Sequence, residues 1–298
     1  MTSRAGALHH SPPQLPPVPV LLPALVAAAA FGILFWEPLV TLGRDWWSDP
    51  DAGHGLLLAP VAVFLAWRAG LEPAGRGRPV LGLIALILAV GLRYLSGLAA
   101  ELFTMRLALL GAIGALVIGA RGLPQLRRWW LPAALLVLSI PLPDVLTSTL
   151  AFPLQLKASQ LGAALLDVRH VPVRLAGNVL HLPGRSLFVT EACSGLRSLT
   201  ALLALGVLIG GLWLRTVWGR AAIVALAIPV AMALNGLRIF LTGFLVYFVS
   251  PSLGEGVMHY TEGWTIFVVA FALLGAAAWG LSRLEALRRR RGPREATG

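Results

Sequence analysis

The feature that most constrains this chain is a succession of apolar stretches long enough to cross a membrane. A membrane-spanning helix needs about 20 apolar residues, because each residue rises about 1.5 Å and the hydrocarbon core is about 30 Å thick. Eight stretches approach or reach that length, near residues 20–42, 54–68, 80–98, 103–120, 129–147, 196–213, 220–249 and 260–282. With 57% hydrophobic and 12% charged residues, the chain cannot hide this surface in a soluble core. The sequence therefore predicts an all-α polytopic membrane protein with about eight transmembrane helices.

The positions of the arginine residues predict how these helices are oriented. Lys and Arg resist translocation, so the basic tail at residues 283–298 is expected inside the cell. Alternating sides from that tail places three basic connections on the same side, and these carry Arg68, Arg76, Arg78, Arg121, Arg127, Arg128, Arg215 and Arg220. We therefore expect a multi-pass protein of the cell inner (cytoplasmic) membrane, embedded in the lipid bilayer with both termini in the cytoplasm.

Three regions are expected along the chain. Residues 1–19 are rich in proline and are predicted to form a disordered cytoplasmic N-terminus. Residues 20–282 are predicted to form one transmembrane domain, and residues 283–298 form the basic tail. Before the sixth span, the transmembrane domain is interrupted by an extracytoplasmic insert at about residues 148–195.

The insert changes its periodicity along its length. Residues 148–168 predict an interfacial amphipathic helix. Its apolar positions are Leu150, Leu154, Leu161 and Leu165, with Lys157 and Gln160 between them. From Val171 to Val189, β-branched and leucine residues are interrupted by Gly177-Asn178 and Pro183-Gly184, which predicts short strands joined by turns. The insert is therefore expected to combine a helix with a small β-ribbon.

The single cysteine, Cys193, lies in the motif EACSGLRS, directly before the sixth stretch. The start of a helix stabilises a thiolate through its free N–H groups and dipole, so a nucleophile fits this position. An isolated cysteine in apolar sequence is more often a small buried residue. Here the polar neighbours Glu191, Ser194 and Arg197 favour chemistry. One cysteine excludes an internal disulfide and a multi-thiolate metal site, and we expect no metal and no other cofactor.

Inside the seventh stretch, the motif NGLRI places Asn235 and Arg238 in apolar sequence. An arginine within a membrane helix costs several kcal/mol unless it snorkels, pairs or lines a wet cavity. Asn235 could orient the guanidinium or make a helix-packing hydrogen bond. We expect residues 220–249 to form one tilted or glycine-broken helix, because a split at Asn235 would place the basic tail outside. Arg238 then lies near the outer leaflet.

His259 stands where the last stretch begins. A lone histidine at an interface is usually only a polar boundary residue. However, the expected topology brings Cys193, Arg238 and His259 to the same outer surface from three spans. A thiol with a free pKa of about 8.5 needs a base, and arginine can stabilise a thiolate or an oxyanion. The set has the parts of a cysteine peptidase or transpeptidase.

These motifs together resemble the exosortase/archaeosortase family of membrane enzymes. The resemblance covers about residues 20–282 and rests on His54-Gly55, Leu182-Pro183-Gly184, EACSGLRS, NGLRI and the His259 segment followed by Gly263. It implies eight spans and an outward active site with a triad carried over to Cys193, Arg238 and His259. It also implies removal of a C-terminal tripartite sorting tail, of the PEP-CTERM kind, from exported proteins, with transfer to an acceptor. Histidine at the third position points to the bacterial branch.

The residues alone leave other functions open. The chain could be a non-enzymatic subunit of an envelope polysaccharide export or assembly system, with Arg238 and Asn235 lining a pathway. It could also be a membrane acyltransferase that uses His259. No nucleic-acid partner is expected, because the net charge of +11 is explained by topology. Glu101 and Arg106 are expected to be interfacial residues, and His54 is expected to belong to a loop turn.

Overall fold

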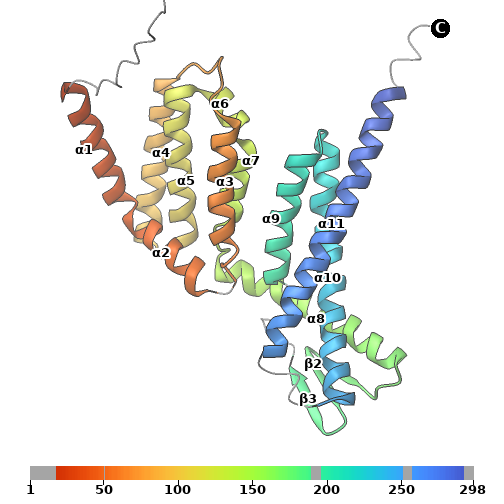
Figure 1. Ribbon diagram of the computed structural model, residues 1–298. Coiled ribbons are helices and arrows are strands. Elements are labelled where there is room, and N and C mark those ends of the chain that lie inside the picture. Colours follow the sequence, from red (N-terminus) through yellow and green to blue (C-terminus); the bar gives the residue numbers. More distant parts are fainter. Residues whose placement is uncertain (1–17, 50, 189–195, 251–256, 292–298) are drawn as a thin grey trace, which may run out of the picture.

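The computed structural model describes residues 18–49, 51–188, 196–250 and 257–291, and these residues are mostly helical (Figure 1). The predicted disordered N-terminus falls almost wholly outside the described residues. The elements are α1 (Val18–Leu34), α2 (Trp36–Ser48), α3 (Gly55–Ala69), α4 (Pro79–Leu98), α5 (Leu102–Arg121), α6 (Leu123–Arg128), α7 (Trp130–Leu138), α8 (Asp144–Val168), β1 (Arg174–Ala176), β2 (Val179–Leu182), β3 (Arg185–Phe188), α9 (Leu196–Trp213), α10 (Val217–Phe248) and α11 (Val257–Arg291).

The helices form two groups, α1–α7 and α8–α11 with the sheet (Figure 1). In the first group α4 and α5 approach closely, since a Cβ on Gly82 would lie only 2.5 Å from the Cα of Gly119. The groups join where α3, α7 and α9 share an apolar core that buries Leu58, Ala62, Leu131, Leu135 and Ala204. The two groups therefore belong to one packed bundle.

The expectation of eight full-length spans is not confirmed. Among the described residues, four helices are long and apolar enough to span: α4, α5, α10 and the Phe267–Arg289 part of α11. The α1–α2 pair, bent by 58°, adds a fifth if it counts as one broken span. The stretch 129–147 is not one helix, because α7 ends at Leu138 and α8 starts only at Asp144. Pro141 and Pro143 lie between them, and proline opposes continuation of a helix.

The seventh predicted span is confirmed as a single helix. α10 runs without a break from Val217 to Phe248 and passes through Asn235. α11 is longer than the predicted stretch and continues through the basic tail to Arg291. The chain therefore does not change sides at Asn235.

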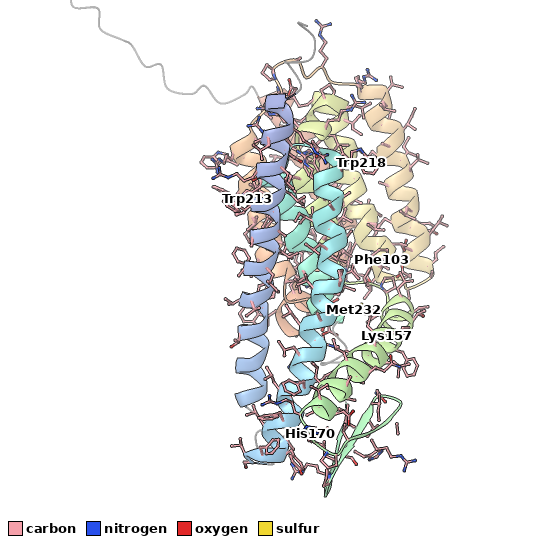
Figure 2. The ribbon with its side chains drawn as sticks, turned by 90° about the vertical axis from the view of Figure 1, so that its right-hand side faces the viewer. Phe103, Lys157, His170, Trp213, Trp218 and Met232 are labelled. Atoms are coloured by element: carbon pink, nitrogen blue, oxygen red, sulfur yellow. The ribbon has the colours of Figure 1, made fainter. Side chains whose placement is uncertain are left out.

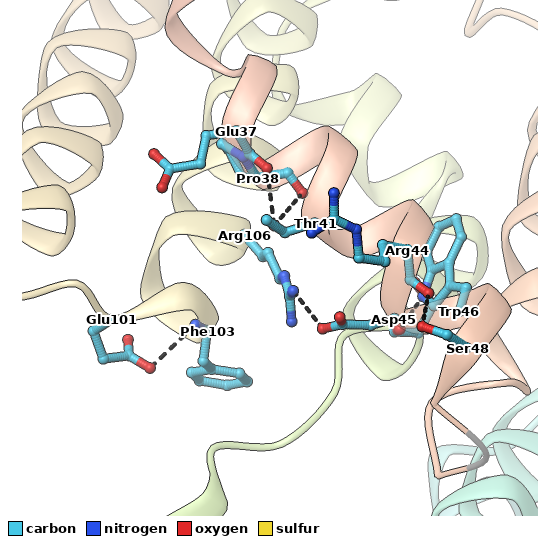
Figure 3. A network of polar contacts seen from close by, with 11 residues as sticks. Glu37, Pro38, Thr41, Arg44, Asp45, Trp46, Ser48, Glu101, Phe103 and Arg106 are labelled. Atoms are coloured by element: carbon cyan, nitrogen blue, oxygen red, sulfur yellow. Dashed lines mark hydrogen bonds and ion pairs between the residues drawn. The ribbon is translucent and has the colours of Figure 1, made fainter.

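Helix α2 is held against α4 and α5 by ion pairs, and Figure 3 shows the pair between Asp45 and Arg106. Asp45 accepts a hydrogen bond of 2.5 Å from Arg106 on α5, and Glu37 accepts one of 2.7 Å from Arg93 on α4. Arg106, which was predicted to be an interfacial residue, is only 3% exposed and is buried between the helices. Its charge is buried because Asp45 provides a counter-charge. Glu101 instead caps α5 by accepting from backbone N–H groups of the first turn.

The turn between α2 and α3 caps the end of α7. The indole Nε1 of Trp46 donates to the carbonyl of Ser139 at 2.7 Å. His54 Nε2 lies 3.1 Å from the carbonyl of Leu138, and since a carbonyl only accepts, this nitrogen carries the proton. Gly55 is required here because a Cβ would collide with the ring of Trp46. His54 therefore has a structural partner, which satisfies a helix-terminal carbonyl that would otherwise lack one.

The basic connections gather at one end of the bundle, the upper end in Figure 1. There α3, α5, α9 and α11 end, and α4 and α10 begin. Glu285 of α11 accepts from the backbone N–H of Arg215 at 3.0 Å and from the hydroxyl of Thr216 at 2.5 Å. Arg128 pairs with Glu72 at 3.1 Å. These contacts tie together the loops that the arginine pattern places on one side.

Candidate functional site

The opposite end of the second group carries the predicted β-ribbon, which is confirmed. β1, β2 and β3 form an antiparallel sheet in that order. The turns fall at the predicted dipeptides, and Gly177 and Gly184 have φ of +63° and +76°, values that glycine adopts without strain. His181 and Ser186 face each other across β2 and β3, with the ring Nδ1 2.8 Å from the hydroxyl. The described residues contain no cluster of three or more His, Cys, Asp or Glu side chains that could hold a metal ion.

The ribbon rests on α8 and α10. Its buried residues pack with residues of both helices in one cluster: Val171, Leu180 and Leu182 with Ala158, Leu166, Ile239 and Val246. The ribbon thereby packs against the C-terminal halves of both helices. Arg169, at the end of α8, adds a cation–π contact with Phe244 at 5.8 Å.

Arg238 lies on the side of α10 that faces α9 and α11. The buried residues Ile223, Ala227, Ala231 and Leu234 form one stripe of α10, which packs against α9 and α11. Arg238 follows Leu234 by four residues and continues this stripe. The side chain is half-buried, and its Nε atom is buried. Asn235 is 4% exposed.

The packing of α9 against α10 shows which residues are level with Arg238. A Cβ on Gly206 would lie 3.4 Å from Cα of Val224, and one on Gly210 would lie 3.5 Å from Cα of Arg220. The helices are therefore antiparallel, and the same register puts Leu196, the first residue of α9, opposite Leu234. Arg238 is one turn further along α10. The start of α9 thus lies close to the level of Arg238 along the bundle.

Several predicted site residues lie outside the described residues. These are Glu191, Cys193 and Ser194, together with the side chains of Arg197 and His259. The backbones of Arg197 and His259 belong to the first turns of α9 and α11. Both turns lie at the same end of the second group as the ribbon (Figure 1). The convergence of Cys193, Arg238 and His259 stays a prediction.

The helix predicted for the insert is confirmed as α8, but the leucines of its predicted apolar face do not form its buried stripe. Leu161 is 39% exposed. The buried stripe consists of Gln155, Ala158, Ser159, Gly162 and Leu166. A Cβ on Gly162 would lie 2.5 Å from Cγ2 of Ile239, so α8 crosses α10 at very short distance. Such a crossing selects small residues for the contact and leaves the leucines at its flanks.

Two buried polar residues of this stripe, Gln155 and Ser159, were missed by the sequence analysis. They are 6% and 0% exposed, and their helix packs against the α10 segment that holds Asn235. The available signal was the spacing of two small residues, Ser159 and Gly162, on one helix face together with Gly236 in NGLRI. Lys157 and Gln160, which the sequence analysis did single out, are exposed.

Comparison with known proteins identifies the family. The model of the transmembrane exosortase family (Exosortase_EpsH) matches residues 46–276, which is more than half of the 298-residue chain. The match begins at Trp46, which caps α7, and ends within α11. Neither the curated proteins nor the solved structures give a match. On the family match, this multi-pass membrane protein belongs to the transmembrane exosortase family.

Proposed function

We propose that this protein is a membrane cysteine transpeptidase, with endopeptidase activity, that removes a PEP-CTERM-like C-terminal sorting tail from exported proteins. The trimmed protein is then transferred to an acceptor. Family membership supports this activity. The observation that carries the proposal is the position of Arg238, half-buried within a continuous helix and facing the helices that begin beside the predicted nucleophile and base.

The energetic cost of placing Arg238 inside the bundle indicates that this residue has a function. A guanidinium inside an apolar bundle is retained where it stabilises a negative charge or lines a wet site. Cys193 precedes Leu196 by three residues, and three residues span at most about 11 Å. Since Leu196 is close to the level of Arg238, the guanidinium of Arg238 and the thiol of Cys193 can reach the same region of the bundle. Asn235, Glu191, Ser194 and Arg197 are proposed as supporting residues.

The reaction proceeds through a thioester. His259 takes the thiol proton of Cys193, and the thiolate attacks the carbonyl carbon of the scissile peptide bond. Arg238 stabilises the oxyanion of the tetrahedral intermediate. When the C–N bond breaks, His259 returns the proton to the leaving amine, and the N-terminal part of the substrate stays on Cys193 as an acyl group. A nucleophilic acceptor, or water, then attacks the thioester and restores the thiol.

The proposed site faces the exterior. It lies at the end of the bundle opposite the basic connections, and basic loops stay in the cytoplasm. Reporter fusions at residue 175, in β1, are expected to be active only outside the membrane, and fusions at residue 125, in α6, only inside. A cytoplasmic signal at residue 175 would reverse the orientation and remove the site from exported substrates.

The activity is tested in cells that express a tail-bearing precursor. Cys193→Ala and Cys193→Ser are expected to leave the precursor unprocessed on an immunoblot, at membrane levels matched to wild type. Ser282→Ala is the control, because this hydroxyl bonds the Trp279 carbonyl near the basic end of α11. Processing is expected to be normal in that variant. Normal processing by Cys193→Ala would exclude the thioester and favour a non-enzymatic envelope component.

A further inference from the structure

The hydroxyl of Ser159 on α8 is a buried polar group that the proposed mechanism leaves unused. The residue is 0% exposed, and its Oγ has no hydrogen-bond partner among the described residues. Burial of an unpaired hydroxyl costs free energy, and alanine would avoid that cost. A serine at this position therefore needs a reason.

Several other hydroxyls on the described helices are satisfied locally. Serine and threonine in a helix commonly bond the carbonyl one turn earlier. Five side chains do so at 2.6 to 3.0 Å: Thr41, Ser48, Ser96, Thr149 and Thr242. Ser159 has the carbonyl of Gln155 in the equivalent position but makes no such bond. Its hydroxyl is thus left available for another group.

The position of Ser159 relates it to the candidate site. A Cβ on Gly162 would meet Ile239, and one on Gly243 would meet Leu166, so a step of four residues along α8 matches four along α10. One turn before Gly162, Ser159 therefore faces the turn of α10 before Ile239, which carries Asn235. Figure 2 shows the two helices side by side at this level, marked by Lys157 and Met232.

The composition of this interface is suited to a polypeptide ligand. Gln155 and Ser159 on α8 and Asn235 on α10 are buried polar residues, and among them the hydroxyl of Ser159 lacks a hydrogen-bond partner within the described part of the chain. An extended peptide that enters an apolar site brings N–H and C=O groups that need partners there. Ser159 is covered in this structure, so such a ligand reaches it only if α8 separates locally from α10.

We propose that Ser159 is a substrate-binding residue, whose hydroxyl donates a hydrogen bond to a main-chain carbonyl of the precursor beside the scissile bond. The inference rests on the proposed function, because it takes the polypeptide substrate from it. The substrate carbonyl then accepts the hydrogen bond for which the Ser159 hydroxyl has no partner among the described residues. Loss of the hydroxyl weakens the enzyme–substrate complex and leaves the folded protein at least as stable.

The first experiment compares processing with stability in the purified full-length protein. Ser159→Ala is expected to lower kcat/KM for the precursor about tenfold, the effect of one hydrogen bond of about 1.4 kcal/mol. Its melting temperature should not fall. Ser96→Ala is the matched control, because that buried hydroxyl bonds the Leu92 carbonyl. It should melt lower and process normally per folded molecule. Wild-type kcat/KM in Ser159→Ala would overturn the proposal.

The second experiment separates binding from catalysis. Cys193 is the only cysteine, so Cys193→Ala gives a thiol-free protein into which single cysteines can be placed. With Ser159→Cys, a precursor that carries one cysteine beside the cleavage position is expected to form a disulfide under mild oxidation. With Ala164→Cys, on the exposed face of α8, it should not. Equal capture by both would refute the assignment of Ser159, whether or not Cys193 proves to be the nucleophile.

Discussion

Removing the carboxylate of Asp45 is expected to destabilise the protein through Arg106. Arg106 is 3% exposed and is bound to Asp45 at 2.5 Å, so Asp45→Ala leaves a buried guanidinium without its counter-charge. Loss of one partner of a buried ion pair costs about 3–5 kcal/mol. Because the side chain of Asp45 is itself 31% exposed, water already screens part of the pair, and we expect about 3 kcal/mol.

This cost translates into a measurable change in thermal unfolding. One kcal/mol shifts the melting temperature by about 2–4 °C in proteins of 150–250 residues, and less in larger ones, so we expect a fall of roughly 6 °C. The double variant Asp45→Ala, Arg106→Met should recover most of it, because an apolar side chain replaces the uncompensated charge. Glu37→Ala breaks the more exposed pair with Arg93 and should cost at most about 1 kcal/mol.

The assay is thermal unfolding of the purified protein in lipid nanodiscs, followed by circular dichroism at constant pH. The double variant provides the decisive comparison. Two results would contradict this reasoning: Asp45→Ala melting at the wild-type temperature, or the double variant melting as low as the single one. Either would show that Asp45 does not stabilise the protein by compensating the buried charge of Arg106.

Three further predictions concern the site and its support. Arg238→Lys is expected to fail in precursor processing at wild-type expression, because an ammonium lacks the planar guanidinium fork; normal processing would remove Arg238 from the chemistry. Gly162→Val should lower the melting temperature by several degrees, since its Cβ would lie 2.5 Å from Ile239, whereas Gly91→Ala, with nothing within 4 Å, should not; equal melting would contradict the crossing. Partial burial raises the pKa of Glu101, but hydrogen bonds from Thr104 and Phe103 outweigh it and hold the pKa below its ordinary value. The stability that Glu101 contributes is therefore present above its unfolded pKa and lost as pH falls through the folded one, so Glu101→Gln should melt lower at neutral pH and lose less on acidification.

Local sequence signals predicted those parts of the fold that depend on local chemistry. Gly177 and Gly184 adopt positive φ at the turns of the ribbon, as the dipeptides indicate. The count of spans was less predictable, because hydropathy does not show where a helix breaks. Pro141 and Pro143 divide one apolar stretch, and the broken end of α7 is capped by side chains from a distant turn. No local pattern reveals that partnership.

The sequence predicted those residues of the candidate site that carry an energetic cost within their own apolar segment. Arg238 and Asn235 interrupt an apolar run, and the cost of a guanidinium in lipid singles them out. Ser159 carries no such cost in sequence, because a helix tolerates a serine at only a small cost in free energy. Its position becomes informative only in the folded protein, where Gly162 packs against Ile239 and the helix face that contains Ser159 is buried. Contact between two helices far apart in the chain decides this, and periodicity within one helix does not reveal it.

The proposed function requires that Cys193 carries the substrate as a thioester. The most direct measurement is peptide mass spectrometry of the full-length protein after brief incubation with precursor and denaturation in acid. We expect the N-terminal fragment of the precursor to be attached to Cys193 and to be released by hydroxylamine, and we expect Cys193→Ala to show no adduct. Processing of the precursor by Cys193→Ala, or an adduct at another residue, would contradict it.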